Sequence, residues 1–136
     1  MKTYITNSAK ETRDLAQELA KKLAAKVFLL NGELGVGKTT FVQGFAKGLG
    51  IKDKILSPTY VLIREYQIPK TLKKLFHIDL YRIEKTGDLG LEEILNSKNN
   101  IVLIEWAEKL EELPKGFVKI IIDKIGDDKR KFTILS

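Results

Sequence analysis

Apolar and polar positions recur with two different periods along the chain, and these periods separate helices from strands. Residues 2–6 alternate in the manner of a short strand. Ser8, with Glu11 three residues later, predicts a capping box, and leucines at four-residue spacing give the following helix one apolar face. The unbroken apolar run in residues 26–31 is typical of a strand buried on both faces. Strands of this kind indicate an α/β architecture.

The same criteria predict the remaining elements. A glycine-rich turn at 32–37 leads into a helix over roughly 38–49, and Gly50 occupies the C′ position that ends it. Further on, the pattern predicts a hairpin of two strands at 60–67 and 72–80, a helix at 88–95, a buried strand at 100–106, a short acidic helix at 107–113 and two final strands at about 117–123 and 130–135. This mixture of βαβ units and antiparallel pairs predicts one domain over residues 1–136, a three-layer α/β fold with a mixed central sheet.

The composition excludes several classes of site. The 136 residues include no cysteine and one histidine, His77, which rules out a disulfide framework, a cysteine zinc site and a histidine-rich metal cage. No apolar run approaches the roughly 18 residues of a membrane span, so we expect a cytoplasmic protein without a membrane partner. The net charge of +6 is unaccompanied by an RNA-binding signature with interleaved aromatics. Solubilising lysines explain this charge better than a polyanionic partner does, and nucleotide phosphates are an equally suitable anion.

The strongest chemical signal is the segment 32–39, which matches the pattern G-x-x-x-x-G-K-[ST] between a buried strand and a helix. Its glycines let successive backbone N–H groups turn inward into an anion-binding nest, to which the helix N-terminus adds partial positive charge. Lys38 can reach the β- and γ-phosphate oxygens, and the Thr39 hydroxyl is positioned to ligate Mg²⁺. The sequence therefore predicts that a nucleoside triphosphate binds on Leu34, Gly35, Val36, Gly37, Lys38, Thr39 and Thr40.

Two predicted strands end in a carboxylate that can complete a magnesium site, Asp79 in the hairpin and Glu105 in the last buried strand before the acidic segment. Mg²⁺ beside a triphosphate takes one or two protein carboxylates, and ligands of open α/β sheets lie at the carboxyl ends of the strands. Either acid can serve, although Asp79 also fits a capping role and Glu105 a solvated acidic helix. His77 shares a strand face with Asp79, which allows a polar pair, or is a partly buried histidine without a chemical role.

The remaining candidates concern the γ-phosphate. Ser57 and Thr59 lie in a loop where P-loop NTPases place a segment that senses this group through a hydroxyl, although a plain turn fits the spacing equally well. Arg64, Arg82 and Arg130 come late enough in the chain to approach the nucleotide. The sequence selects none of the three, and an arginine supplied by a partner protein is the alternative.

Five short motifs occur in one order along the chain: GELGVGKTT at 32–40, SPTY at 57–60, HIDLYR at 77–82, GLEE at 90–93 and IEW at 104–106. With them the chain resembles the bacterial TsaE (YjeE) family. The first motif is shared with many ATPases, whereas its combination with the other four is much more specific. The resemblance implies a P-loop NTPase-like fold and a role as the ATPase component that makes N6-threonylcarbamoyladenosine at position 37 of tRNA. It also implies a heteromer of TsaB and TsaD as the partner, with tRNA contacted only indirectly.

The resemblance further implies roles for single residues. It gives Lys38 the role of the phosphate-binding lysine, makes Thr39 and Glu105 ligands of Mg²⁺, and makes Asp79 the essential acid of the sensor strand. It also implies that Trp106 is the family's tryptophan beside the metal-binding glutamate. The alternative is that Trp106 only packs at the end of the strand.

Ser8 and Arg130 are implied by the same resemblance to lie near the adenine and ribose of ATP or ADP. The leading interpretation is a Mg²⁺-dependent ATPase, slow alone and faster with its partners. Two other functions stay open: a small-molecule kinase, and a nucleotide-gated binding module whose output is the conformation of the loop at 57–60. In the ATPase the catalytic residues are Lys38, Asp79 and Glu105, and the switch or sensor residues are Ser57, Thr59, His77 and Trp106.

Overall fold

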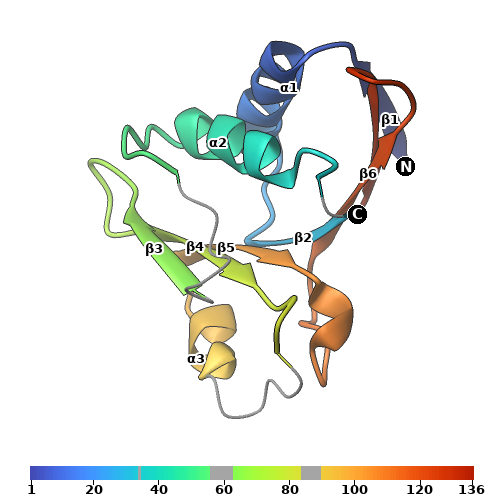
Figure 1. Cartoon of the computed structure of the whole chain (residues 1–136). Helices are drawn as coiled ribbons and strands as arrows, with labels where there is room; N and C mark the ends of the chain where they lie inside the picture. Colours follow the sequence, from blue (N-terminus) through green and yellow to red (C-terminus); the bar gives the residue numbers. More distant parts are fainter. Residues whose placement is uncertain (34, 56–62, 84–89) are drawn as a thin grey trace.

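A seven-stranded sheet with helices on both faces forms the described part of the protein (Figure 1). The computed structural model describes residues 1–33, 35–55, 63–83 and 90–136. In chain order the elements are β1 (Lys2–Thr6), α1 (Ala9–Lys22), β2 (Val27–Asn31), α2 (Lys38–Gly48), β3 (Ile63–Gln67), β4 (Lys74–Asp79), α3 (Leu91–Asn96), β5 (Asn100–Glu105), the 3-10 turn η1 (Ala107–Lys109), β6 (Val118–Lys124) and β7 (Arg130–Leu135).

The centre of the sheet is parallel and its edges are antiparallel. The strand order is β1-β7-β6-β2-β5-β4-β3, in which β6, β2, β5 and β4 form the parallel centre. The predicted pairings of β3 with β4 and of β6 with β7 are antiparallel, as expected. Because the central strands point the same way, their carboxyl ends meet at one edge, where Glu105 is in register with Leu30 of β2 and with Asp79 of β4. The predicted mixed sheet is confirmed.

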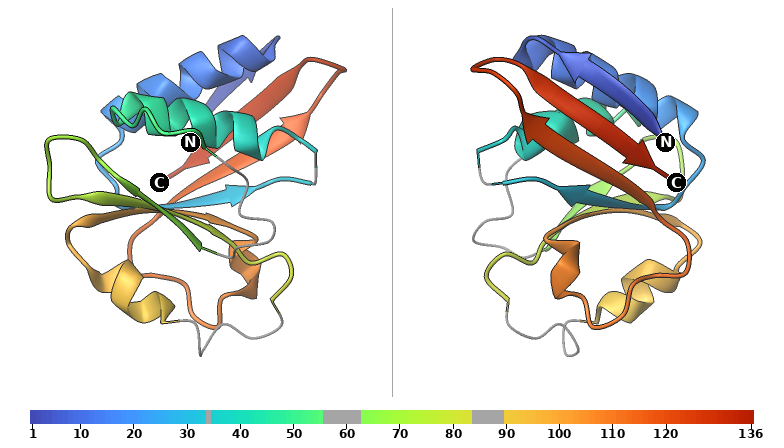
Figure 2. Two further views of the ribbon diagram at one scale, coloured as in Figure 1. Left: turned by 60° about the vertical axis from the view of Figure 1, so that its left-hand side comes forward. Right: turned by 90° about the vertical axis from the view of Figure 1, so that its right-hand side faces the viewer.

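Side chains of the central strands alternate between two apolar layers. Phe28 and Leu30 of β2 pack in the layer of α1 and α2, whereas Val27 and Leu29 pack in the layer of α3 and η1. Figure 2 shows α1 and α2 lying together on one face of the sheet, with α3 on the other. The predicted burial of β2 on both faces is therefore confirmed. Packing in both layers fixes the carboxyl end of this strand, where the loop at 32–37 begins.

Helices α1 and α2 cross at very short range because two glycines of α2 face α1. A Cβ atom added at Gly44 would lie 2.2 Å from the carbonyl oxygen of Arg13, and one added at Gly48 would lie 2.5 Å from that of Gln17. The two helix backbones therefore touch, and the position of α2, which begins at Lys38, depends on this contact.

We expect Gly44→Ala to lower the free energy of unfolding by about 2–3 kcal/mol, because the added methyl group pushes α1 away from α2. The better helix propensity of alanine offsets only about 1 kcal/mol of the overpacking. Urea denaturation followed by circular dichroism measures the change. Gly116→Ala is the matched control, since a Cβ atom there meets no heavy atom within 4 Å. Equal stability of the two variants would contradict the close helix contact.

The start of α1 forms the predicted cap with one difference. Ser8 Oγ accepts the backbone N–H of Glu11 at 3.1 Å, as a capping box requires. The return bond comes from Asn7, whose backbone N–H donates to Glu11 Oε1 at 2.9 Å. The Ser8 hydroxyl therefore caps the N-terminus of α1.

The helix predicted over 107–113 is wrong. Only the turn Ala107–Lys109 forms, and the backbone at Leu110 is already extended. Ala107 is buried but Leu113 is 56% exposed, so the segment lacks a continuous apolar stripe. Pro114 also disfavours helical backbone at the residue before it.

The described residues allow only part of two other boundaries to be compared. The predicted strand at 60–67 is present from Ile63 to Gln67, and residues 60–62 lie outside the described residues. The predicted helix at 88–95 is present as Leu91–Asn96, and residues 88–89 lie outside the described residues. None of the described helices has the length and apolar character that crossing a membrane requires.

Candidate functional site

The loop between β2 and α2 has the backbone of an anion-binding nest. Gly35 and Gly37 have φ angles of +78° and +107°, in the left-handed region that glycine adopts without strain. A Cβ atom at Gly32 would lie 2.7 Å from Val36 Cγ1 and 3.0 Å from the Ile122 carbonyl oxygen, so this position has no room for a side chain. The glycines of the motif are thus explained by backbone geometry and close approach. Leu34 lies outside the described residues.

The N-terminus of α2 leaves its first amides available to an anion. Its N-cap is Gly37, which has no side-chain hydrogen bond to the helix, and the first helical bond runs from the N–H of Phe41 to the carbonyl of Gly37. The N–H groups of Lys38, Thr39 and Thr40 therefore have no partner within the helix. Helix α1 is different, because the Ser8 hydroxyl already occupies its N-terminus. Three amides and the helix dipole converge where the sequence predicts phosphate.

Lys38 is held in this site by groups at the ends of two strands. Its ammonium group donates to the Gly32 carbonyl oxygen at 2.8 Å and lies 3.8 Å from Glu105 Oε1. It also lies 4.6 Å from the centre of the Trp106 ring, within the range of a cation–π interaction. The side chain is 6% exposed. A buried cation at the mouth of an amide nest is chemically suited to an oxyanion.

Glu105 is a buried carboxylate, and its partner is a histidine on the neighbouring strand. The side chains of His77 and Glu105 are joined by a hydrogen bond of 2.6 Å between Nε2 and Oε2. The residues are 0% and 5% exposed. The polar pair with Asp79 that the shared strand face allowed is not formed, because β4 lies beside β5 and brings His77 to Glu105. Glu105 therefore does not belong to a solvated acidic helix, which was its alternative interpretation.

Asp79 ends β4 directly beside Glu105 and is half-buried. Its Oδ1 accepts the backbone N–H of Tyr81 at 2.9 Å, so one oxygen has a turn-forming role. The backbone N–H of Leu80 donates to the Glu105 carbonyl oxygen at 3.1 Å and ties the two strand ends together. The two predicted acids, Asp79 and Glu105, are thus neighbours at the carboxyl edge of the sheet, and Glu105 lies near Lys38.

Trp106 follows β5 with a φ of +61°, an uncommon conformation for a bulky residue. Its ring contacts that of Tyr81, with centroids 4.9 Å apart. Lys109 donates to the Tyr81 carbonyl oxygen and lies over the Tyr81 ring. Tyr81 was missed as a site residue, and its place in the HIDLYR motif, two residues after Asp79, is the signal that could have found it. The left-handed turn aims the indole at Lys38.

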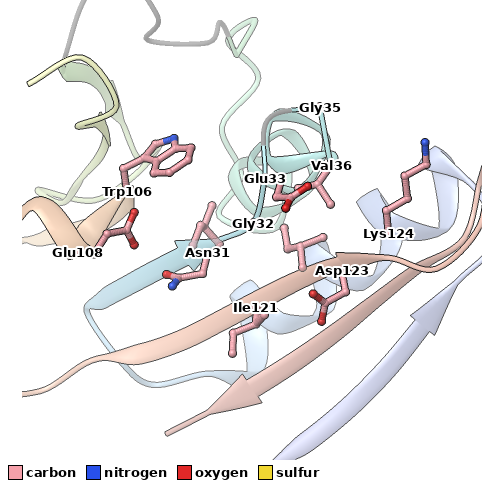
Figure 3. A pocket seen from close by; sticks show the side chains of 12 residues that line it. Asn31, Gly32, Glu33, Gly35, Val36, Trp106, Glu108, Ile121, Asp123 and Lys124 are labelled. Carbon is pink, nitrogen blue, oxygen red and sulfur yellow. The ribbon is translucent and has the colours of Figure 1, made fainter.

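A cavity of about 840 Å³ adjoins the loop on the side away from α2 (Figure 3). Asn31 and Ile121 lie on its floor, and Trp106 lies at one end. Three carboxylates, those of Glu33, Glu108 and Asp123, line it together with Lys124. The acidic lining disfavours a polyphosphate here, so the amides of α2 are the better site for the phosphates.

Arg130 connects the loop to the β6–β7 turn. Its Nε donates to the Val36 carbonyl oxygen at 2.8 Å, and its Nη1 donates to the carbonyls of Gly126, Asp127 and Lys129 at 3.0–3.1 Å. Thr6 of β1 is the register partner of Arg130 in β7, so the start of α1 lies at the same edge of the sheet as Arg130. The expected contact of Ser8 and Arg130 with adenine and ribose stays a prediction. Ser57 and Thr59 lie outside the described residues.

The donor set fits a Mg²⁺ ion shared with phosphates. Glu105 is fixed by His77 through Oε2, while Oε1 faces the site, and Thr39 is in the first turn of α2. The described residues contain no cluster of three or more carboxylate, histidine or cysteine side chains that could hold a metal alone. Mg²⁺ at NTPase sites needs no such cage, because phosphates and water supply most of its ligands.

The comparison with known families agrees with this geometry. The family model described as threonylcarbamoyl adenosine biosynthesis protein TsaE matches residues 6–132. The chain belongs to the TsaE family. Within that family it is 41% identical over 131 residues to the tRNA threonylcarbamoyladenosine biosynthesis protein TsaE of Bacillus subtilis, covering 94% of this chain and 81% of the relative. It is 39% identical to the protein of the same name from Rickettsia bellii, covering 93% and 89%.

The structural comparison gives the same fold. The crystal structure of Bacillus subtilis YdiB superimposes with a TM-score of 0.78 at 35% sequence identity, covering 98% of this chain and 83% of that one. The predicted P-loop NTPase-like fold is therefore confirmed. Membership of the TsaE family, expected from the five motifs, is confirmed as well.

Proposed function

We propose that the protein binds ATP with Mg²⁺ on the loop at 32–39 and hydrolyses it as the ATPase component of threonylcarbamoyladenosine synthesis on tRNA, together with TsaB and TsaD. The observation that carries the proposal is Lys38, a buried cation at the mouth of an amide nest and within 4 Å of a buried carboxylate. A lysine is costly to bury, and a site that binds polyphosphate explains why this one lies there.

Different groups of the chain bind the triphosphate, hold the metal and orient the attacking water. The amides at the start of α2 and the Lys38 ammonium group bind the β- and γ-phosphate oxygens and stabilise negative charge as the terminal phosphate departs. Thr39 and Glu105 would hold Mg²⁺, which supplies further neutralisation of phosphate charge when bound. Asp79, beside Glu105 at the same edge, orients the attacking water and accepts its proton.

The role in tRNA modification is supported by the family's description and by the names of the relatives, which are threonylcarbamoyladenosine biosynthesis proteins. We propose that this protein acts there with a TsaB–TsaD heteromer and contacts tRNA only indirectly.

The guanidinium group of Arg130 already bonds to four carbonyl oxygens, which disfavours it as the arginine that neutralises the transferred phosphate. We propose that a partner protein supplies this arginine, which makes hydrolysis by the isolated protein slow.

The test is phosphate release from purified protein with ATP and Mg²⁺, with and without TsaB and TsaD. We expect slow release alone and an increase on the order of tenfold or more with both partners, because a partner completes the charge stabilisation. Bovine serum albumin at matched concentration controls for crowding. Unchanged turnover with the partners would contradict the coupling, and a phosphorylated small molecule in place of free phosphate would favour a kinase.

A further inference from the structure

His77 is a polar side chain at the centre of the site that contacts no predicted nucleotide position. It is the only histidine of the chain and is fully buried on β4. Its register neighbour on β5 is Leu103, so its ring reaches diagonally to Glu105, two residues further on. Burying an imidazole costs free energy unless its nitrogens are hydrogen-bonded. In the described residues, the bond to Glu105 is the one that satisfies this ring, because Nδ1 has no hydrogen-bond partner.

The two oxygens of Glu105 have different surroundings. Oε2 receives the 2.6 Å hydrogen bond from His77, whereas Oε1 lies 3.8 Å from the Lys38 ammonium group. Because the second distance exceeds that of a hydrogen bond, the carboxylate is held by the histidine and only attracted by the lysine. If His77 did not hold it, the carboxylate would be free to turn toward Lys38 and form a direct ion pair.

The hydrogen-bond pattern assigns the ring's proton. A carboxylate accepts, so Nε2 of His77 carries the hydrogen, and the neutral ring then has a bare acceptor at Nδ1. Among the described residues, His77 Nδ1 and Arg64 Nε are the two buried side-chain nitrogens without a partner. Arg64 is the register partner of His77 across β3 and β4, so an acceptor and a donor occupy opposed positions on one sheet face. The two are chemically complementary, which favours the Nε2–H tautomer.

We propose that His77 is a positioning residue that turns the Glu105 carboxylate toward the metal and prevents its collapse onto Lys38. The inference rests on the proposed function, because it concerns the same Mg²⁺–nucleotide site. Outer hydrogen bonds of this kind typically change metal affinity by roughly 10- to 100-fold. The ring contacts neither metal nor phosphate in this role and acts only through Glu105.

The test compares two amides that differ in reach. The amide nitrogen of His77→Gln can occupy the place of Nε2 and still donate to Glu105, whereas that of His77→Asn reaches only as far as Nδ1. Calorimetry with AMP-PNP, a non-hydrolysable ATP analogue, gives the affinity of each protein with and without MgCl2. We expect Mg²⁺ to strengthen binding in the wild type and in His77→Gln, and this gain to fall roughly 10-fold or more in His77→Asn.

The metal-free affinity separates this inference from the proposed function. AMP-PNP binding without Mg²⁺ should stay within about threefold in His77→Gln, and in His77→Asn it should fall by less than the gain from Mg²⁺ does, because Glu105 then competes for Lys38 while the α2 amides remain. An equal gain from Mg²⁺ in all three proteins would overturn the role of His77 and leave the ATP site intact. A wild type that binds AMP-PNP without any gain from Mg²⁺, or does not bind it, would instead overturn the proposed site itself.

The wild-type protein provides a test that does not depend on the folding of a variant. Because the chain has one histidine, the ¹⁵N spectrum of the imidazole is free of overlap. We expect Nε2 to be protonated in the free protein and in the complex with Mg²⁺ and AMP-PNP, with a proton that exchanges slowly. A bare Nε2, or two tautomers in fast exchange, would overturn the inference.

Discussion

Replacing Lys38 with methionine is expected to weaken AMP-PNP binding by roughly 100-fold or more while leaving the protein folded. Hydrogen bonds from a charged donor contribute about 1.5–3 kcal/mol each, and the ammonium group can make one to each of two phosphate groups. Its removal also exposes the nucleotide to the carboxylate of Glu105, which lies 3.8 Å from the ammonium group in the free protein. Both effects act in the same direction.

Stability gives the internal check on this variant. Methionine keeps the length and apolar stem of lysine, but the substitution removes only one partner of a buried pair and leaves the Glu105 carboxylate with His77 alone, which lowers stability. The thermal midpoint should therefore fall, and the affinities are compared at a temperature at which circular dichroism shows both variants folded. The matched control is Lys47→Met, since Lys47 is exposed in the last turn of the same helix. A Lys38→Met protein that binds AMP-PNP like the control would contradict the assignment of the phosphate site.

Local sequence signals were sufficient for the loop and for the strand-end acids. The glycines at 35 and 37 are required by positive φ angles, a property of each position alone, so the motif could be interpreted without knowledge of the rest of the fold. Asp79 and Glu105 were found because parallel strands place their carboxyl ends together. That topological rule needs only the order of elements along the chain.

The features that were missed depend on which strands are neighbours. The bond between His77 and Glu105 spans β4 and β5, and its partner choice follows from a register that the residues of β4 alone do not reveal. Same-strand alternation pointed to Asp79 instead. The left-handed turn at Trp106 is likewise fixed by tertiary contacts, among them the Tyr81 ring. Such choices are made by packing, where propensity carries little information.

Replacing Asp79 with asparagine is expected to separate ATP binding from hydrolysis. The change keeps a carbonyl oxygen to accept the Tyr81 N–H bond and leaves the side-chain volume almost unchanged. It removes the ability to take a proton from water, which is worth roughly 10²- to 10⁴-fold in rate. AMP-PNP affinity should stay within about threefold, since Lys38 and the α2 amides are untouched.

Phosphate release in the presence of TsaB and TsaD measures the loss, and calorimetry with AMP-PNP measures the retained binding. Glu65→Gln is the matched carboxylate-to-amide control, because Glu65 is exposed on β3 and pairs with Lys74. Hydrolysis by Asp79→Asn at the rate of this control would show that the carboxylate has no part in the chemistry.

The same variant distinguishes a true ATPase role from a nucleotide-gated binding module. If turnover of ATP drives the reaction cycle, threonylcarbamoyladenosine formation by the reconstituted proteins should fall together with hydrolysis in Asp79→Asn. If the bound nucleotide alone sets the docked state, the variant should still assemble and support tRNA modification, because its nucleotide site is intact. Lys38→Met cannot make this distinction, since it removes binding and hydrolysis together. The position of Asp79 beside Glu105, and outside the amide nest, is what allows one substitution to isolate the chemical step.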